Sequence, residues 1–244
     1  PPRLSSIPEP QQVSAMQKEN VNEMYRLIRN KNRRLNGWEK YFRTEKLQSS
    51  PLILNIPTGS RCNIRCIFCT DRRGERASSD YRDLSFDEFI SMYARGWGEA
   101  FMTSGMVALY GWGEPLVNPD YERIFDSMTE NFPGLGISIC TNGILFSRPW
   151  AEKILAVENS ELNFSVNAAT KETYRSLTGS IRFETVLENI RHLITLRRKH
   201  GTRNPSVTLS YAAATTNIHE IPAFVRLAAD LGADSVLVQD IMML

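Results

Sequence analysis

Six short apolar segments separated by stretches with helical spacing are the feature that most constrains how this chain can fold. The first, from Pro51 to Pro57, is bounded by prolines and fits a buried strand better than a helix. Strands that alternate with helices pair in parallel through right-handed crossovers, in a sheet that is open or curled into a barrel. The predicted fold class is therefore α/β, with strands at 52–57, 106–110, 136–141, 161–166, 206–212 and 235–239.

Helical patterns fill the intervals between these strands. The longest has a single apolar face, made of Phe183, Val186, Leu187, Ile190, Leu193 and Ile194. Ser85 and Glu88 have the spacing of a capping box, which predicts that a helix begins there. Residues 71–83 are charged and rich in small side chains, so we expect that segment to be exposed and mobile. Besides the helix that begins at Ser85, helices are predicted near 120–131, 149–157, 183–200 and 219–231, of which 183–200 is the longest.

The N-terminal quarter of the chain has a different character. Residues 1–12 contain four prolines among polar neighbours, a composition typical of a flexible leader. Residues 13–50 form a predicted helical segment, because apolar side chains recur in it every three or four positions. Its basic side chains make a solvated helix face or bind an acidic leader peptide or RNA. They are Arg26, Arg29, Lys31, Arg33 and Arg34.

Composition limits the remaining choices. With 244 residues, 42% of them hydrophobic, the chain can bury the core of one large domain, which we place at residues 51–244. A net charge of +2 demands neither a nucleic acid nor an anionic membrane as partner, and no apolar run is long enough to span a bilayer. Because the chain ends at Leu244, before the helix that should follow the sixth strand, we expect a fragment of a longer protein.

Three of the four cysteines lie within eight positions, which indicates a ligand set. Cys62, Cys66 and Cys69 can aim their sulfurs at one centre, as iron–sulfur loops do. A disulfide framework is disfavoured because the chain shows no secretory signal, and zinc because a fourth ligand is missing nearby. Three cysteines on a four-iron cluster leave one iron open to another ligand. Cys140 stands apart, and we interpret it as a small buried hydrophobe.

The Cys-x3-Cys-x2-Cys spacing, with Phe68 before the last cysteine, resembles the cluster loop of the radical S-adenosylmethionine (SAM) superfamily. The resemblance implies a partial (β/α)6 barrel, here with an N-terminal helical segment, and Cys62, Cys66 and Cys69 as ligands of a 4Fe–4S cluster. The helical entry, the Pro-Leu-Ile-Leu strand at 51–54 and the Gly-x-Gly-Glu-Pro form at 111–115 look most like the subgroup with a C-terminal SPASM/twitch extension that carries auxiliary clusters. The cysteines of such an extension are not in this sequence.

Further motifs at the predicted strand ends match that resemblance. In parallel α/β folds, ligands bind where the carboxyl ends of the strands meet. Gly113 and Glu114 resemble the Gly-Gly-Glu motif that holds the methionine end of SAM, although Trp112 replaces its first glycine. Asn142, in a Thr-Asn-Gly ending, resembles a residue near SAM or substrate. Ser165 and Asn167 resemble a Ser-x-Asp pair that contacts SAM, commonly through its ribose, although Asn167 stands where an acid is frequent. Residues 170–174 and 177–179 resemble the loop that follows it.

The activity implied by the resemblance is reductive cleavage of SAM to a 5'-deoxyadenosyl radical, which abstracts hydrogen from a peptide or small-metabolite substrate. An electron donor such as flavodoxin or ferredoxin is implied as a partner, and free thiols awaiting iron favour the cytoplasm. An RNA-modifying enzyme served by the basic residues 26–34 is the alternative within the family. A non-enzymatic iron–sulfur electron carrier or regulator is the alternative outside it, and the predicted SAM pocket argues against that class.

Overall fold

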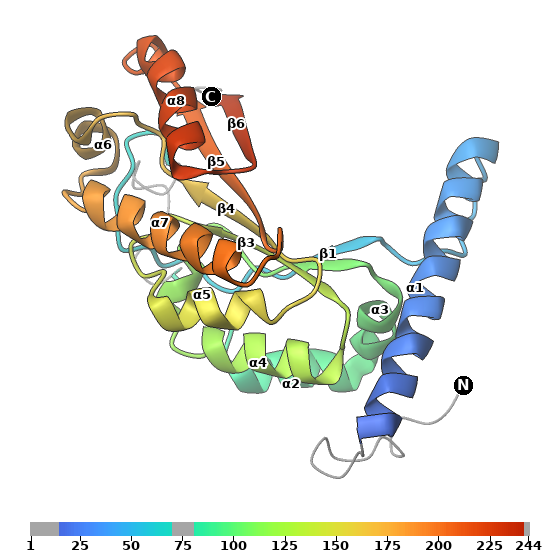
Figure 1. The fold of residues 1–244 in the computed structure, drawn as a ribbon. Helices are drawn as coiled ribbons and strands as arrows, with labels where there is room; N and C mark the ends of the chain where they lie inside the picture. The colour runs from blue at the N-terminus through green and yellow to red at the C-terminus, as the bar shows by residue number, and fades with distance from the viewer. Residues whose placement is uncertain (1–14, 70–80, 242–244) are drawn as a thin grey trace.

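The computed structural model describes residues 15–69 and 81–241, and its centre is one parallel sheet. Each strand pairs in parallel with the next in the order β1-β2-β3-β4-β5-β6, so β1 and β6 are the two edges of an open sheet (Figure 1). The predicted partial (β/α)6 barrel is therefore confirmed. The strands are β1 (Ile53–Asn55), β2 (Met106–Ala108), β3 (Gly136–Thr141), β4 (Glu161–Ser165), β5 (Ser206–Ala213) and β6 (Ser235–Asp240).

The helices after α1 connect successive strands, as the alternating pattern predicted. The predicted leader at 1–12 and nearly all of the segment 71–83 lie outside the described residues. The helical elements are α2 (Phe86–Met92), the π-helical turn η5 (Tyr93–Trp97), α3 (Gly98–Thr103), the 3-10 turn η6 (Pro115–Val117), α4 (Tyr121–Asn131), α5 (Arg148–Leu155), α6 (Lys171–Thr178), α7 (Phe183–Lys199), the 3-10 turn η7 (Ile218–Glu220) and α8 (Ile221–Leu231).

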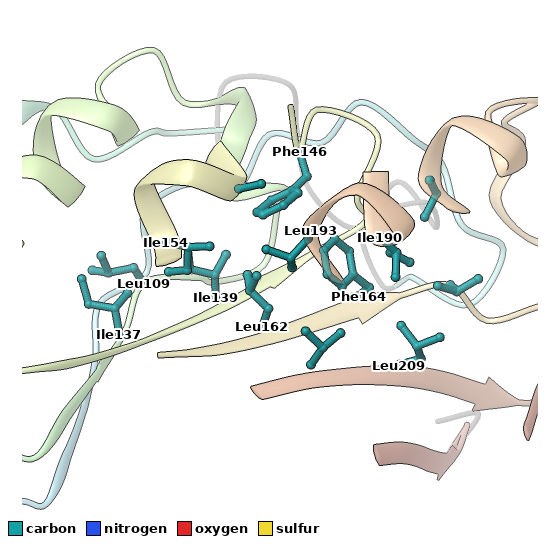
Figure 2. Packing of buried hydrophobic residues seen from close by; sticks show 14 of the residues in the cluster. Leu109, Ile137, Ile139, Phe146, Ile154, Leu162, Phe164, Ile190, Leu193 and Leu209 are labelled. Carbon is teal, nitrogen blue, oxygen red and sulfur yellow. The ribbon is translucent and has the colours of Figure 1, made fainter. Parts of the chain in front are cut away.

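The hydrophobic core lies between one face of the sheet and the helices that cover it. Leu162 and Phe164 of β4 point toward α5 and α7, where they meet side chains such as Ile154 and Leu193 (Figure 2). The six apolar residues predicted on one face of α7 are all buried. Because side chains alternate along a strand, Asn163 and Ser165 face the opposite side of the sheet, toward the barrel interior.

Local hydrogen bonds explain where two of the helices begin. The amide of Ser85 donates to Glu88 Oε2 at 3.0 Å, and the amide of Glu88 donates to Ser85 Oγ at 3.2 Å, which confirms the capping box before α2. Residues 170–179, predicted as a loop, contain the helix α6. Thr170 caps its first turn by accepting from the amide of Thr173, and Gly179 ends it with a φ of 70°.

The N-terminal segment is one helix, α1 (Ala15–Phe42), which lies beside α3 on the β1 side of the molecule (Figure 1). The face of α1 that is buried is largely polar. Arg29 donates to the carbonyl of Ser104 at 3.1 Å, Asn32 exchanges hydrogen bonds with the backbone of Ser50, and Glu39 accepts from the amide of Gln48 at 2.6 Å. Helical spacing therefore identified the helix correctly. Of its apolar residues, Val21, Ile28 and Leu35 are half-buried beside the polar contacts, whereas Met24, Trp38 and Phe42 are exposed.

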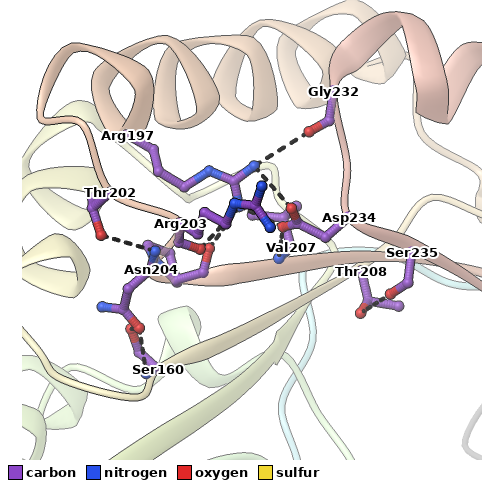
Figure 3. Close-up of polar contacts among 11 residues, drawn as sticks. Ser160, Arg197, Thr202, Arg203, Asn204, Val207, Thr208, Gly232, Asp234 and Ser235 are labelled. Carbon is purple, nitrogen blue, oxygen red and sulfur yellow. Dashed lines mark hydrogen bonds and ion pairs between the residues drawn. The ribbon is translucent and has the colours of Figure 1, made fainter.

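A second polar cluster closes the amino-terminal ends of β5 and β6. Arg197 pairs with Asp234 and donates to the carbonyl of Pro205 at 2.8 Å, while Asp234 accepts from the amide of Val207 at 2.7 Å (Figure 3). These contacts tie α7 to the start of both strands at the opposite end from the carboxyl ends. None of the described helices has the length and apolar content that a membrane crossing requires.

Candidate functional site

A cavity of about 1040 Å³ opens where the carboxyl ends of the strands meet the loops that follow them. Its walls come from the cysteine loop after β1, the glycine loop after β2, and the ends of β3 to β6. Every site residue predicted from the sequence lines this one cavity. Those residues are Cys62, Cys66, Phe68, Cys69, Gly113, Glu114, Asn142, Ser165 and Asn167.

The cysteine loop is held in place by backbone bonds to α6. The amides of Arg65 and Ile67 donate to the carbonyls of Thr178 and Leu177, at 3.1 and 2.8 Å. Those carbonyls belong to the last turn of a helix, where carbonyls have no partner inside the helix. The helix α6, which the sequence analysis did not predict, therefore supports the cysteine loop.

Asn142, at the end of β3, supports the same loop from the other side. Its Nδ2 donates to Asn63 Oδ1 at 2.7 Å and lies 3.9 Å from the Sγ of Cys62. Its Oδ1 accepts from the amide of Ile144 at 3.0 Å, which fixes the orientation of the side chain. Asn142 thus positions the first cysteine.

The donor set fits the iron–sulfur cluster that the motif implies. All three cysteines are free thiols on one short loop facing one cavity, and the amide of Cys69 donates to the carbonyl of Cys66 at 3.1 Å in a tight turn. Across residues 15–69 and 81–241, no three His, Cys, Asp or Glu side chains are placed to hold a single metal ion. In a cluster each cysteine binds a different iron, so the sulfurs stand farther apart than around one ion.

Gly113 allows two loops to approach closely. A Cβ at this position would collide with the carbonyl oxygen of Arg61 and lie 2.6 Å from the carbonyl carbon of Ser60. The amide of Gly113 donates to Gly59 at 3.2 Å, and that of Glu114 donates to Arg61 at 2.8 Å. The glycine is therefore required by the backbone next to the cysteine loop. Trp112, which departs from the family motif, is exposed at the cavity wall.

Glu114 joins the ends of β2 and β3. Its buried carboxylate accepts from Thr141 Oγ1 at 2.6 Å, from the amide of Asn142 at 2.7 Å and from the amide of Leu116 at 3.3 Å. Loss of solvation on burial raises the pKa of Glu114 to about 7, although these hydrogen bonds act to lower it. The protein thus already uses both carboxylate oxygens, and recognition of an ammonium group by Glu114 stays a prediction.

Asn167 shapes the ends of β4 and β5. It has a left-handed φ of 62°, which asparagine tolerates better than most residues. Its Oδ1 accepts from the amide of Ala212 at 2.8 Å, and its Nδ2 donates to the carbonyl of Ser165 at 3.2 Å. Asn217, fully buried, donates to the carbonyls of Asn167 and Ala212. Asn167 therefore meets the cavity with its amide already hydrogen-bonded.

Small side chains across three strands form the floor of the cavity. Ser165 Oγ lies 3.5 Å from Cys140 Sγ and 3.4 Å from Ser210 Oγ. Cys140 was interpreted as a buried hydrophobe, but it is only partly buried and lines the cavity, where burial raises the pKa of its thiol. Strand alternation could have identified Cys140 and Ser210, since buried neighbours flank each of them.

The charge of the cavity comes from its loops. The lining residues contributed by β3, β4, β5 and β6 are uncharged in the described chain, and the two arginines on the wall belong to the cysteine loop. One of these, Arg61, pairs with Asp83. His192, His200 and His219 are not on the lining, in agreement with their predicted positions on or beside helices.

These features together define a parallel α/β barrel with a three-cysteine cluster loop. The profile of the Radical SAM superfamily matches residues 56–228, well over half of the sequence, and the chain belongs to that superfamily. Membership gives the chain its two cofactors, a 4Fe–4S cluster and SAM. Cys62, Cys66 and Cys69 are the residues in the motif positions for the cluster.

Several curated proteins resemble this chain in sequence. A tungsten-containing aldehyde ferredoxin oxidoreductase cofactor-modifying protein of Pyrococcus furiosus is 27% identical over 190 residues, covering 78% of this chain and 51% of that protein. The GTP 3',8-cyclase of Desulforamulus reducens is 27% identical over 180 residues, covering 73% and 52%. The mycofactocin maturase MftC of Mycobacterium tuberculosis is 22% identical over 192 residues, covering 78% and 44%. The chain thus spans about half the length of these relatives.

Solved structures agree on the fold. Streptococcus suis SuiB bound to S-adenosylmethionine has a TM-score of 0.64 at 17% identity, with 87% of this chain and 45% of SuiB covered. SuiB bound to its precursor peptide SuiA has a TM-score of 0.63 at 16% identity, with 86% and 43% covered. At this level of identity the likeness concerns the barrel fold alone.

Proposed function

We propose that this chain is the catalytic barrel of a radical SAM enzyme that modifies a peptide. When bound, the cluster and SAM supply a 5'-deoxyadenosyl radical that abstracts hydrogen from the substrate. In the proposed site Cys62, Cys66 and Cys69 hold the cluster, and Phe68 and Gly113 form the adjoining wall. The observation that carries the proposal is that the cysteine loop and the predicted SAM residues face one cavity.

The same cavity favours a peptide over a nucleotide. A nucleoside triphosphate needs several cations around its phosphates, as charge-assisted hydrogen bonds from Arg and Lys. The strand side chains to which the SAM site gives no role, such as Ser210 and Gln239, instead offer neutral hydroxyl and amide groups. Such groups pair with the amides and carbonyls of a polypeptide. Among the relatives in sequence, the mycofactocin maturase MftC fits this class, whereas the GTP 3',8-cyclase represents the other.

Within that site, Glu114 is the proposed acceptor for the ammonium group of SAM, next to Asn142. Ser165 is the proposed contact to the ribose, and Asn167 sets the strand end beside it. The geometry supports a divided role for the pair, since the Asn167 amide is hydrogen-bonded within the protein and the Ser165 hydroxyl faces the cavity.

The finer parts of the proposal rest on the sequence motifs. They are a small metabolite as the alternative substrate, membership of the SPASM/twitch subgroup, reduction by an electron donor of the flavodoxin or ferredoxin type, and a cytoplasmic location. The RNA-modifying alternative loses support from the basic segment, because Arg29 is buried against carbonyls and Arg26 pairs with Glu23. The electron-carrier alternative has no use for the residues gathered around Glu114.

The test is anaerobic reconstitution followed by SAM binding and detection of 5'-deoxyadenosine after chemical reduction. We expect both in the wild type, and a Glu114→Ala variant that keeps its cluster but binds SAM at least tenfold more weakly, the size of a lost charge-assisted hydrogen bond of about 1.5–3 kcal/mol. Full cluster without SAM binding would favour the electron carrier. Tight binding of GTP to the SAM-loaded protein would favour a nucleotide substrate.

A further inference from the structure

One face of α1 carries a row of exposed side chains with regular spacing. We name it the α1 stripe, and it consists of Met24, Leu27, Lys31, Arg34, Trp38 and Tyr41. The steps are alternately three and four residues, so the six side chains lie one above another along the helix. At 1.5 Å per residue the stripe is about 25 Å long.

The α1 stripe is not the side by which α1 docks. The docked side is Tyr25, Arg29, Asn32 and Glu39, which are buried. In contrast, Trp38 is 60% exposed and Tyr41 80% exposed, and nothing in residues 15–69 and 81–241 covers them. A helix already anchored by polar bonds on one side does not need a second apolar side for its own packing.

Aromatic side chains form a cluster at the C-terminal end of the α1 stripe. Phe42, also exposed, lies with its ring centroid 4.4 Å from that of Trp38 and 4.9 Å from that of Tyr41. Trp and Tyr are the side chains that most often anchor protein interfaces, because they bury a large area at little cost in conformational entropy. This cluster is the expected anchor of a docked partner.

The centre of the α1 stripe is basic. Lys31 and Arg34 are exposed, and no ion pair in the described part of the chain neutralises either of them. Apolar residues therefore flank two cations, with Met24 and Leu27 on one side and the aromatic cluster on the other. A complementary partner presents two carboxylates between apolar side chains.

We propose that the α1 stripe docks an acidic amphipathic helix of a polypeptide partner. Apolar side chains of that helix cover Met24, Leu27 and Trp38, and its central Asp or Glu residues pair with Lys31 and Arg34. The inference does not depend on the reaction in the cavity, because α1 lies outside the cavity lining.

Other occupants fit less well. A second copy of this chain, packed antiparallel on the same face, would bring the two Lys31 and Arg34 pairs together and repel. RNA binds aromatic side chains by stacking on flat exposed rings, whereas Trp38 and Phe42 are tilted by 49° to each other, and Met24 and Leu27 offer nothing to a phosphate. An anionic membrane shares the basic and aromatic chemistry, so the experiment includes it.

The experiment measures binding of two labelled synthetic helices to the full chain by fluorescence anisotropy. Both helices carry leucines at their outer contact positions. The centre of one carries two glutamates, and the centre of the other carries two lysines. We expect the glutamate helix to bind and the lysine helix to bind at least tenfold more weakly. The double variant Lys31→Glu, Arg34→Glu should reverse this order, and Trp38→Ala should weaken the glutamate helix at least tenfold.

Matched controls separate docking from unfolding. Ile181→Ala removes another exposed apolar side chain elsewhere, 78% exposed against 60% for Trp38, and should leave binding unchanged. The circular dichroism spectrum should be the same for all variants. Equal binding of the two helices, tighter binding of single-stranded RNA or of phosphatidylserine vesicles than of the glutamate helix, or self-association that Trp38→Ala abolishes would each overturn the proposal.

Discussion

Neighbouring residues along a strand face opposite sides of the β-sheet, and the two faces differ in what they contact. On the outer face, Phe164 and Leu209 are fully buried against α5, α7 and α8. On the inner face, the next residues, Ser165 and Ser210, line the cavity. In many parallel barrels bulky side chains fill the interior. Here small polar side chains leave it open, so the outer face supplies the buried apolar core and the inner face borders the cavity.

The largest expected effect belongs to the cysteine loop on the inner side. Cys62→Ala, Cys66→Ala or Cys69→Ala should each abolish assembly of the cluster, because three ligands leave no redundancy, while the fold persists. Iron counting and visible absorption after anaerobic reconstitution measure this. Cys140→Ala, on the same cavity wall, should keep a full cluster, and a full cluster in any of the other three variants would sink the ligand assignment.

The outer face should show its role in stability. Phe164→Ala removes a fully buried ring and should cost about 3–5 kcal/mol of unfolding free energy. Ser165→Ala, one residue on, should cost less than about 1 kcal/mol, since its hydroxyl faces the cavity. Urea unfolding of the two variants measures the contrast. Comparable losses from both would remove the distinction between the faces.

Glu114 differs most from the apolar outer face of the sheet, because it is a buried carboxyl group on the inner side. Its folded pKa of about 7 lies above the unfolded value of 4.5, so protonation stabilises the folded state. That contribution is fully present below pH 4.5 and is lost as the pH rises through 7, a change of roughly 3 kcal/mol.

Glu114→Gln carries no charge and should lack this dependence. We therefore expect the unfolding free energy of the variant relative to wild type, both without cluster, to rise by about that amount between pH 4.5 and pH 8. Urea unfolding across this range measures it. If the unfolding free energies of the variant and the wild type change equally with pH, the carboxylate is better solvated than its burial indicates.

A smaller loss of stability than at Phe164 is expected at the polar contacts of α1. Asn32→Ala removes hydrogen bonds with Ser50 and Thr103 and should cost about 1–3 kcal/mol, because it leaves part-buried backbone groups without these partners. Trp38→Ala, on the exposed side, should change stability by less than about 0.5 kcal/mol. Thermal unfolding distinguishes the two. A greater loss from Trp38→Ala would mean that the α1 stripe packs within the fold.

The order of strands and helices was predictable because period and length report which side of an element is buried. Val186, Ile190 and Leu193 recur at helical spacing and are buried as expected. On α1 the same rule identified the helix and, in Val21, Ile28 and Leu35, part of its docked side, but not the polar residues that dock beside them. Polar residues such as Asn32 and Glu39 dock there by bonding to backbone groups outside the helix, and spacing along the helix carries no information about those partners.

The sequence by itself predicted the cysteine ligand set and determined the parallel sheet and the strand ends at which the cavity forms. These follow from short-range chemistry: three thiols within eight positions, alternation along strands and glycines beside a carboxylate. Only the tertiary structure decided that α6 supports the cysteine loop, that Gly113 is needed by the backbone of Arg61, and that Glu114 is hydrogen-bonded to Thr141 and Asn142. Each is a contact between segments far apart in the chain, and such contacts exist only once the sheet has brought its loops together.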